Sequence, residues 1–351
     1  MADWAVIMAG GVGKRFWPMS LQRKPKQFLA LSGGASLLEE CYQRLLRYYD
    51  EKRILIAASA EHRECFVELL PNFPLEQVLW EPVGRNTAAC IAWASESIRR
   101  KDPEAIIGVF PSDHSIHDVE EFALCIERAC AQARGRIVLF GIEPTRAETG
   151  YGYIEMGGAL REASDGRFYG VKRFCEKPAL EMAKQYLESG RYLWNGGIFI
   201  YDAVTMMQEL KAYEPELYDG VISLCDRPSE LETIFPSLKS ISIDYAVMER
   251  TKNCVVERVN FAWNDIGSWA AVQELFESDS SGNTVVGDAY VQDCEDVFVF
   301  STKEKFVAAL GVKDLVIVNT PNAVLVTTPA RAQEVRKIVD ALEREGREDL
   351  L

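Results

Sequence analysis

The chain has 351 residues and a formal net charge of −14, and 48% of its residues are hydrophobic. Its length allows one large domain and a smaller one, and its acidity argues against nucleic-acid binding. No apolar run approaches the roughly 20 residues of a membrane helix, and no basic segment precedes the first apolar run, so we expect a cytoplasmic protein without a membrane anchor.

The first predicted element is a buried strand that ends in a glycine cluster. Residues 4–9 are apolar, and three glycines follow them directly, namely Gly10, Gly11 and Gly13. Glycines let the backbone turn tightly and bring its N–H groups against a ligand. Arg15 and Lys26 add positive charge close behind. The stretch from Ala9 to Pro18, called the glycine loop below, therefore predicts a polyphosphate-binding loop at the carboxyl end of a strand.

Two familiar phosphate-binding loops do not fit this stretch. A P-loop would need Ser or Thr in place of Arg15, and Met8 stands where its first glycine should be. The dinucleotide fingerprint fails because Phe16 occupies its third glycine position. A glycine turn that binds nothing is the alternative, but such a turn does not require Arg15 and Lys26 beside it.

The same stretch carries a resemblance to a known family. The sequence from Gly10 to Ser20 reads Gly-Gly-x-Gly-x-Arg-x-Trp-Pro-x-Ser, and Pro-Lys-Gln-Phe follows at 25–28. These motifs resemble the signature of the sugar-1-phosphate nucleotidylyltransferases, in particular their mannose-1-phosphate guanylyltransferase branch. The resemblance implies that the glycine loop and Arg15 hold the β- and γ-phosphates of a nucleotide. It also implies that Lys26 neutralises charge near the reacting phosphates.

Strands and helices alternate after the loop. Ser36 and Glu39 form a capping box that opens a helix to about Tyr48, and the apolar runs 53–58 and 77–80 predict buried strands. This alternation predicts an α/β fold with a doubly wound, mostly parallel sheet and ligands at the carboxyl ends of its strands. The resemblance implies the Rossmann-like, GT-A-like nucleotidyltransferase form, whose sheet is mixed.

The segment 81–87 reads Glu-Pro-Val-Gly-Arg-Asn-Thr, and Asn86 or Thr87 is predicted to cap a helix that runs to about Arg100. In the resembling family this segment lies at the nucleobase and ribose side of the site. The resemblance therefore implies nucleotide contacts from four residues, namely Gly84, Arg85, Asn86 and Thr87. A loop that only caps the helix is the alternative, and the two are compatible.

Two aspartates follow apolar, strand-like runs. Asp113 comes after 105–110, and Asp265 comes after 254–261. Mg²⁺ prefers oxygen ligands and takes one or two carboxylates, so a sheet edge that gathers these aspartates would suit it. A helix cap is the alternative for Asp113, but Asp118 is better placed for that role. No cysteine pair has the Cys-x-x-Cys spacing of a zinc site. We therefore predict that Asp113 and Asp265 share a bound Mg²⁺.

The pattern changes after a predicted strand at 136–141. Glycines, aromatic residues and a few polar groups alternate in three segments, at 149–155, 171–178 and 194–201. Sugars are bound by walls of this kind. The resemblance implies that Gly150, Glu176 and Asn195 face mannose hydroxyls and that Lys177 contacts the sugar phosphate. A solvated Glu176–Lys177 charge pair is the alternative.

Residues 277–283 have the composition of a linker. They separate a predicted catalytic domain, residues 1–277, from a small β-rich domain, residues 284–351, with a final helix opened by Pro329. The short strands resemble the family's left-handed β-helix-like domain, from which we expect packing or a homodimer contact. Some relatives carry a further fused isomerase domain. This sequence stops before one, so isomerase activity is not expected.

The resemblance covers nearly the whole chain and implies one reaction. GTP and α-D-mannose 1-phosphate would give GDP-mannose and pyrophosphate by in-line, Mg-assisted attack on the α-phosphorus. One alternative is a nucleotidylyltransferase for another base or sugar. Another is a catalytically silent, regulatory sensor of nucleotide sugars. The presence of Arg15, Lys26, Asp113 and Asp265 argues against a silent protein.

Overall fold

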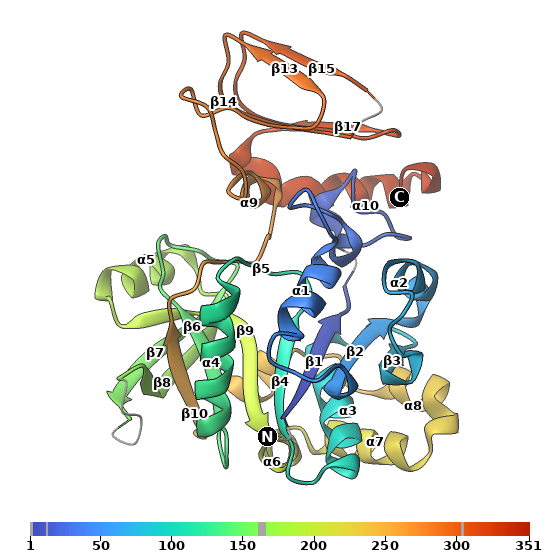
Figure 1. Ribbon diagram of the computed structural model, residues 1–351, viewed down its shortest axis with the longest axis vertical. Helices are drawn as coiled ribbons and strands as arrows, with labels where there is room; N and C mark the ends of the chain where they lie inside the picture. Colours follow the sequence, from blue (N-terminus) through green and yellow to red (C-terminus); the bar gives the residue numbers. More distant parts are fainter. Residues whose placement is uncertain (1–2, 12, 161–165, 303–304) are drawn as a thin grey trace.

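A mixed sheet of nine strands organises the larger part of the computed structural model, and a smaller β-rich part lies at one end of it (Figure 1). The structure describes residues 3–11, 13–160, 166–302 and 305–351. Met1 and Ala2 at the start of the chain, and Val12 of the predicted glycine loop, lie outside the described residues. The strand order in the sheet is β3-β2-β1-β4-β9-β6-β10-β8-β7.

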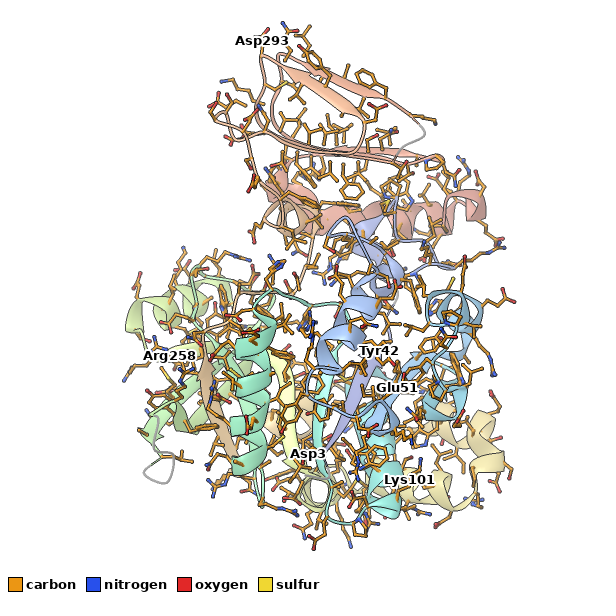
Figure 2. All side chains as sticks on the ribbon, in the orientation of Figure 1. Asp3, Tyr42, Glu51, Lys101, Arg258 and Asp293 are labelled. Carbon is orange, nitrogen blue, oxygen red and sulfur yellow. The ribbon has the colours of Figure 1, made fainter. Side chains whose placement is uncertain are left out.

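The first half of the sheet is parallel. Its strands are β1 (Asp3–Ala9), β2 (Ile54–Ser59), β3 (Val78–Glu81) and β4 (Ile106–Pro111). Its helices are α1 (Leu37–Leu45), α2 (Arg63–Leu69), α3 (Asn86–Lys101) and α4 (Val119–Gln132). Ser36 and Glu39 form the predicted capping box at α1. Tyr42 of α1 donates a hydrogen bond to Glu51 at 2.5 Å and ties the helix to the turn before β2 (Figure 2).

The second half of the sheet is mixed. Its strands are β6 (Ile137–Ile142), β7 (Gly152–Ala159), β8 (Phe168–Glu176), β9 (Tyr192–Asp202) and β10 (Cys254–Val259). Strand β9 runs antiparallel to both of its neighbours, β4 and β6. The mixed sheet is confirmed. The expectation of a mostly parallel sheet is correct for the first half. In the second half only β6 and β10 pair in parallel, because β9 and the β7–β8 hairpin pair antiparallel with their neighbours.

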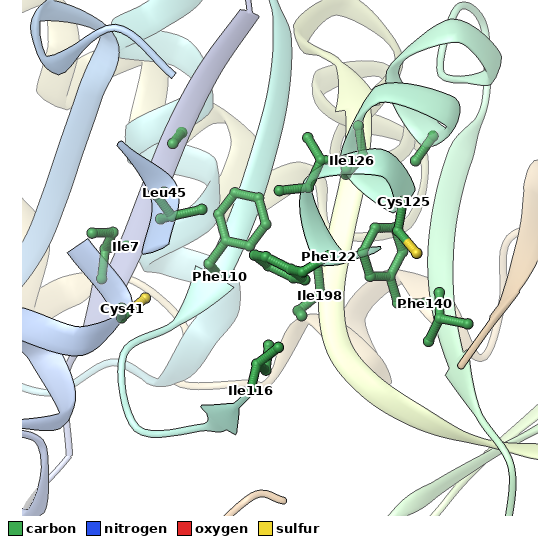
Figure 3. Packing of buried hydrophobic residues seen from close by; sticks show 14 of the residues in the cluster. Ile7, Cys41, Leu45, Phe110, Ile116, Phe122, Cys125, Ile126, Phe140 and Ile198 are labelled. Carbon is green, nitrogen blue, oxygen red and sulfur yellow. The ribbon is translucent and has the colours of Figure 1, made fainter. Parts of the chain in front are cut away.

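Helices cover both faces of the sheet. Ala5 and Ile7 of β1 pack with α1, α2 and α4, whereas Val6 packs with α3 and with α6 (Ala203–Tyr213) and α7 (Pro215–Asp226). Successive strand side chains point to opposite faces, so each face has its own core. Figure 3 shows Phe110 and Phe122 in the first core, with ring centroids 6.0 Å apart. This burial on both faces explains the continuous apolar runs of the strands.

Other helical segments complete the larger part. They are α5 (Leu180–Ser189), α8 (Leu231–Ser237), the π-helical turn η7 (Asp244–Met248) and α9 (Trp269–Gln273). Among the described residues, we find no helix with the length and apolar character that spanning a membrane requires.

The small β-rich part is a short β-helix-like coil. Strands β12 (Thr284–Val286), β14 (Glu295–Ser301) and β16 (Lys313–Asn319) pair in parallel, as do β13 (Ala289–Gln292) and β15 (Val307–Leu310). Strand β17 (Val324–Thr327) adds antiparallel to β16. The predicted final helix begins as the 3₁₀ turn η8 (Pro329–Val335) and continues as α10 (Arg336–Arg344).

A third hydrophobic cluster joins the two parts of the chain. Phe16 and Trp17 of the glycine loop and Trp269 of α9 pack together with Phe298 of β14 and Val335 of η8. The boundaries at 277 and 284 remain a proposal, since the packing runs across them.

Candidate active site

A cavity of about 270 Å³ lies at the carboxyl ends of β1 and β4. Both halves of the sheet contribute to its walls. Seven of the predicted site residues line it, namely Gly10, Thr87, Asp113, Gly150, Glu176, Asn195 and Asp265. The parallel strands bring the first of these residues to the edge of the sheet, and β9 returns Asn195 to the same edge.

Lys26 links the two predicted metal ligands. Its ammonium donates to Oδ2 of Asp113 at 2.7 Å and to the backbone carbonyl of Asp265 at 2.8 Å. Gln27 anchors this turn beneath the glycine loop, because its amide donates to the carbonyl of Ala9 at 2.9 Å. The close approach explains Gly13, which has a φ of 65° and where a Cβ would lie 2.5 Å from the Cβ of Lys26.

The charges at this edge keep Asp113 ionised. Burial raises the pKa of its carboxyl, but the ammonium of Lys26 outweighs that effect and lowers the pKa below its ordinary value. Burial lowers the pKa of His114, which favours its neutral form. On the other aspartate, Oδ1 of Asp265 accepts a hydrogen bond from the hydroxyl of Tyr151 at 2.6 Å.

The two aspartates fit a cation that brings other ligands with it. Lys26 bonds Oδ2 of Asp113 and Tyr151 bonds Oδ1 of Asp265, so each carboxylate has a second oxygen to offer. Among the described residues there is no group of three or more His, Cys, Asp or Glu side chains placed to hold a metal ion. A cation here would therefore rely on two carboxylates plus substrate phosphates and water, which is the usual pattern for Mg²⁺.

The side of the cavity that is predicted to bind the sugar carries acids and amides. Asn195 donates to Oδ1 of Asp244 at 3.0 Å, and its own Oδ1 accepts from the backbone of Gly197 at 3.1 Å. Oε2 of Glu176 is buried without a hydrogen-bond partner among the described residues. Burial and the nearby charge of Glu176 raise the pKa of Asp244 to about 7. These groups can accept hydrogen bonds from ligand hydroxyls.

A glycine missed by the sequence analysis lies closest to this wall. A Cβ on Gly152 would lie 2.5 Å from Oε2 of Glu176, whereas one on Gly150 would meet Glu148 instead. Both glycines line the cavity. The absence of a side chain at Gly152 leaves the space beside the unpartnered Glu176 oxygen open. The Gly-x-Gly spacing at 150–152 was the available signal.

A second cavity, of about 460 Å³, shares Gly150, Tyr151 and Asp265 with the first. Its walls carry three cations, from Arg15, Arg146 and Lys177. The ammonium of Lys177 also lies 3.1 Å from Oε1 of Glu176. Arg15 and Lys177, predicted from distant segments, thus face one space. Arg146 was not predicted, because a lone arginine in a loop carries no motif.

The nucleobase segment is only partly as predicted. Thr87 lines the first cavity, but Gly84, Arg85 and Asn86 line neither of the two cavities. Arg85 donates to the carbonyl of Pro236, so its guanidinium is held against α8. The prediction that Asn86 or Thr87 caps the helix is wrong: Arg85 is the N-cap residue, α3 begins at Asn86, and the Thr87 hydroxyl accepts from the backbone of Ile243 at 2.9 Å.

Glu81 is a further residue that the sequence analysis missed. It is the last residue of β3, and its side chain is buried, with Oε2 3.4 Å from where a Cβ on Gly10 would lie. Burial raises the pKa of this carboxyl to about 7, and no other effect offsets it. Glu81 itself lines neither cavity, but its carboxyl lies beside Gly10, which lines the first. A carboxylate can accept hydrogen bonds from a ligand with paired N–H donors.

Comparison with known proteins gives matches along nearly the whole chain. Residues 4–282 match the family described as nucleotidyl transferase, and residues 288–342 match the MannoseP isomerase/GMP-like beta-helix domain. A mannose-1-phosphate guanylyltransferase of Klebsiella pneumoniae is 40% identical, over 98% of this chain and 74% of its own. The Escherichia coli protein of that name is 40% identical, over 97% of this chain and 74% of its own.

Solved structures agree with this comparison. A structure described as mannose-1-phosphate geranyltransferase from Thermus thermophilus matches with a TM-score of 0.89 and 33% identity, over 98% of this chain and 100% of its own. One described as mannose-6-phosphate isomerase from Helicobacter pylori matches with a TM-score of 0.61 and 26% identity, over 75% of this chain and 100% of its own.

Proposed function

This chain belongs to the nucleotidyl transferase family, and we propose from that premise that it makes GDP-mannose and pyrophosphate from GTP and α-D-mannose 1-phosphate. The names of the curated relatives supply the substrates. The observation that carries the chemistry is Lys26, whose one ammonium bonds Asp113 and Asp265 at a cavity built from both halves of the sheet.

The reaction needs no side-chain nucleophile. An oxygen of the sugar phosphate forms a bond to the α-phosphorus of GTP, the bond from that phosphorus to the β-phosphate oxygen breaks, and pyrophosphate leaves. Catalysis then rests on alignment of the reactants and on neutralising their charge. We assign the β- and γ-phosphates to Arg15 and the amides of the glycine loop. Lys26 would lie near the reacting phosphates, and Lys177 would hold the sugar phosphate.

Enzymes of this family generally use a divalent metal ion, and we propose Mg²⁺ here. Asp113 and Asp265 would hold it, and the lowered pKa of Asp113 keeps that ligand ionised at neutral pH. When bound, Mg²⁺ offsets the negative charge of the phosphates. Lys26 would hold the two aspartate segments together whether or not the cation is bound.

We propose that Glu81 selects the base. Guanine presents two adjacent donors, its ring N–H and its exocyclic amino group, and one carboxylate can accept from both. Adenine lacks that pair, and thymine and uracil lack the amino group. A buried carboxylate left without a partner is costly, so a wrong base is rejected by more than the loss of a contact.

On the sugar side, we propose that the free Oε2 of Glu176 and the amide of Asn195 receive mannose hydroxyls. The open space at Gly152 supports this assignment, since any side chain there would occupy the position beside Glu176. Gly150 would line the entrance between the two cavities.

Pyrophosphate release across nucleotides and sugar 1-phosphates tests the proposal. We expect the highest kcat/KM with GTP and mannose 1-phosphate. Equal or better kcat/KM with UTP or dTTP would indicate a relative that uses another base. No turnover with any pair would indicate a silent sensor, and nucleotide-sugar binding without turnover would identify it as one.

A further inference from the structure

The glycine loop is held by the last segments of the chain. Lys14 lies 2.7 Å from a carboxylate oxygen of Glu343 and 3.1 Å from Asp340, both on α10. Arg15 donates from Nη1 to Oε1 of Gln333 at 2.6 Å. The indole of Trp17 donates to the carbonyl of Leu350 at 2.8 Å. Consecutive parts of the loop are therefore fixed by side chains and backbone from η8 and beyond.

The two adjacent cations of the loop, Lys14 and Arg15, have partners of different charge. Lys14 meets two carboxylates, which cancel its charge locally. Arg15 meets a neutral amide, which can orient a guanidinium without cancelling its charge. Gln333 and Arg15 both line the second cavity, together with Lys177. The positive charge kept at Arg15 therefore faces the space that Lys177 also faces.

We propose that Gln333 is a positioning residue for Arg15, so that the C-terminal part completes the phosphate end of the active site. Gln333 fixes one edge of the guanidinium, and the remaining N–H groups of Arg15 are left for an anionic ligand. The ligand class is a pyrophosphate group, either within the nucleotide or as the released product. This inference rests on the proposed function, which gives Arg15 its phosphate role.

The chemistry of residue 333 provides a graded test. Gln333→Met keeps the length of the side chain but loses the acceptor, and we expect KM for GTP to rise about tenfold, as for a lost positioning hydrogen bond. Gln333→Glu keeps the acceptor but adds a charge that cancels Arg15 and repels phosphate, so the rise should be larger still. KM for mannose 1-phosphate should change little in both variants. Glu334→Gln is the matched control, since Glu334 pairs with Arg331 and Lys337 on the same helical segment.

A merely structural role for Gln333 predicts the reverse order. In Gln333→Glu, a salt bridge between the introduced carboxylate and Arg15 would hold the loop at least as well as the native amide. That variant would then equal the wild type, and Gln333→Met would be worse. That order, or a wild-type KM for GTP in both Gln333 variants, would overturn the inference. Melting temperatures verify that each variant is folded.

The proposed function is tested separately by the wild type. A wild-type protein that forms no nucleotide sugar refutes the function and leaves the inference to a binding measurement. Calorimetric titration with inorganic pyrophosphate then reports on Arg15 directly, with Arg15→Met as the reference for complete loss. Weaker binding to Gln333→Glu than to Gln333→Met supports positioning, and equal binding to both variants and the wild type refutes it.

Discussion

Lys26 shows how one buried charge can organise a site. Its ammonium is almost fully enclosed, with 8% of the side chain exposed, and it is satisfied by Asp113 and by the carbonyl of Asp265. A buried ammonium needs such partners, so burial of Lys26 and proximity of the two aspartate segments imply each other. Lys26 therefore fixes the two aspartate segments relative to each other.

We expect Asp113→Asn and Asp265→Asn to lower kcat by orders of magnitude. Each change keeps the shape of the side chain and removes a charge that would hold the cation, where stabilisation is largest in the transition state. The measurement is kcat against Mg²⁺ concentration. Melting temperature is the control, and Asp113→Asn should lose more stability because Lys26 keeps its burial. Near-wild-type turnover in either variant would refute the shared metal site.

We expect Glu81→Gln to change stability with pH in a defined direction. The folded pKa of Glu81 is about 7, above the ordinary 4.5, so its proton leaves the unfolded chain first as pH rises. Ionisation of the buried carboxyl therefore lowers the free energy of unfolding as pH rises between these two values. The loss is complete above pH 7, where it amounts to about 3 kcal/mol. The variant should melt higher than wild type at pH 8 and equally at pH 4. Equal melting at both pH values would contradict the buried, unpaired carboxyl.

The same substitution tests the choice of base. If Glu81 accepts from guanine as a carboxylate, Glu81→Gln should raise KM for GTP about tenfold or more and weaken the preference over UTP. In the wild type, KM for GTP should fall as pH rises through 7, because the ionised form binds. An unchanged GTP:UTP ratio in the variant would place base selection elsewhere.

At this scale the sequence was informative where residues sit in a motif. Arg15, Lys26 and Lys177 were predicted from their spacing and family resemblance. Arg15 and Lys177 line the second cavity, and Lys26 lies behind Asp113 and Asp265 of the first. Glu81 and Gly152 were missed because their importance comes from burial and from the space around them. Those properties depend on which strands become neighbours, and neighbours in space are not evident from one segment.

At the scale of elements, β9 lies between the parallel half and the mixed half of the sheet. It runs antiparallel between β4 and β6 and carries Asn195 to the edge where β4 delivers Asp113. The loops that we propose for the nucleotide follow the parallel strands, and the wall that we propose for the sugar comes from β7, β8 and β9. The continuous apolar runs predicted most of these strands. The direction of β9 was not predicted, because hydrophobic pattern does not encode whether a strand runs parallel or antiparallel.

Lys177, directly after β8, is proposed to bind the sugar phosphate and not the nucleotide, and kinetics can test this assignment. Lys177 follows β8 with a φ of 47°, and its backbone N–H donates to the carbonyl of Tyr151 at 3.2 Å. We expect Lys177→Ala to raise KM for mannose 1-phosphate about tenfold or more and to change KM for GTP little, since a lysine acts as a point charge on phosphate. A larger effect on GTP would assign Lys177 to the nucleotide. Lys172→Ala, which removes an exposed lysine of β8 paired with Glu155, is the control.

At the scale of the whole molecule, the chain has two matched sequence regions but a shared core. The third cluster joins Phe16 and Trp17 to Leu325 and Val335, so each part covers hydrophobic side chains of the other. The linker composition at 277–283 predicted a boundary, and it could not reveal that packing crosses it. The homodimer contact expected of the β-rich part remains a prediction.

We expect the wild type to unfold in one transition because of this shared core. Leu325→Ala removes a side chain with 2% exposure and should lower stability by roughly 2–5 kcal/mol. The transitions by scanning calorimetry and by fluorescence of the seven tryptophans, among them Trp17 and Trp269 of the shared core, should then shift together. Two transitions, with only one moved by Leu325→Ala, would favour independent domains. Leu124→Ala is the control, because Leu124 is 49% exposed on α4.

The contacts between the glycine loop and the last segments of the chain have a consequence for folding during synthesis. The hydrogen bonds of Arg15 and Trp17 reach partners 318 and 333 positions later. A ribosome needs on the order of tens of seconds to make that length. During this time the aromatic side chains of Phe16 and Trp17 lack their cover, and Arg15 lacks Gln333. Half-made chains would thus offer an apolar surface to chaperones and no finished triphosphate site to GTP.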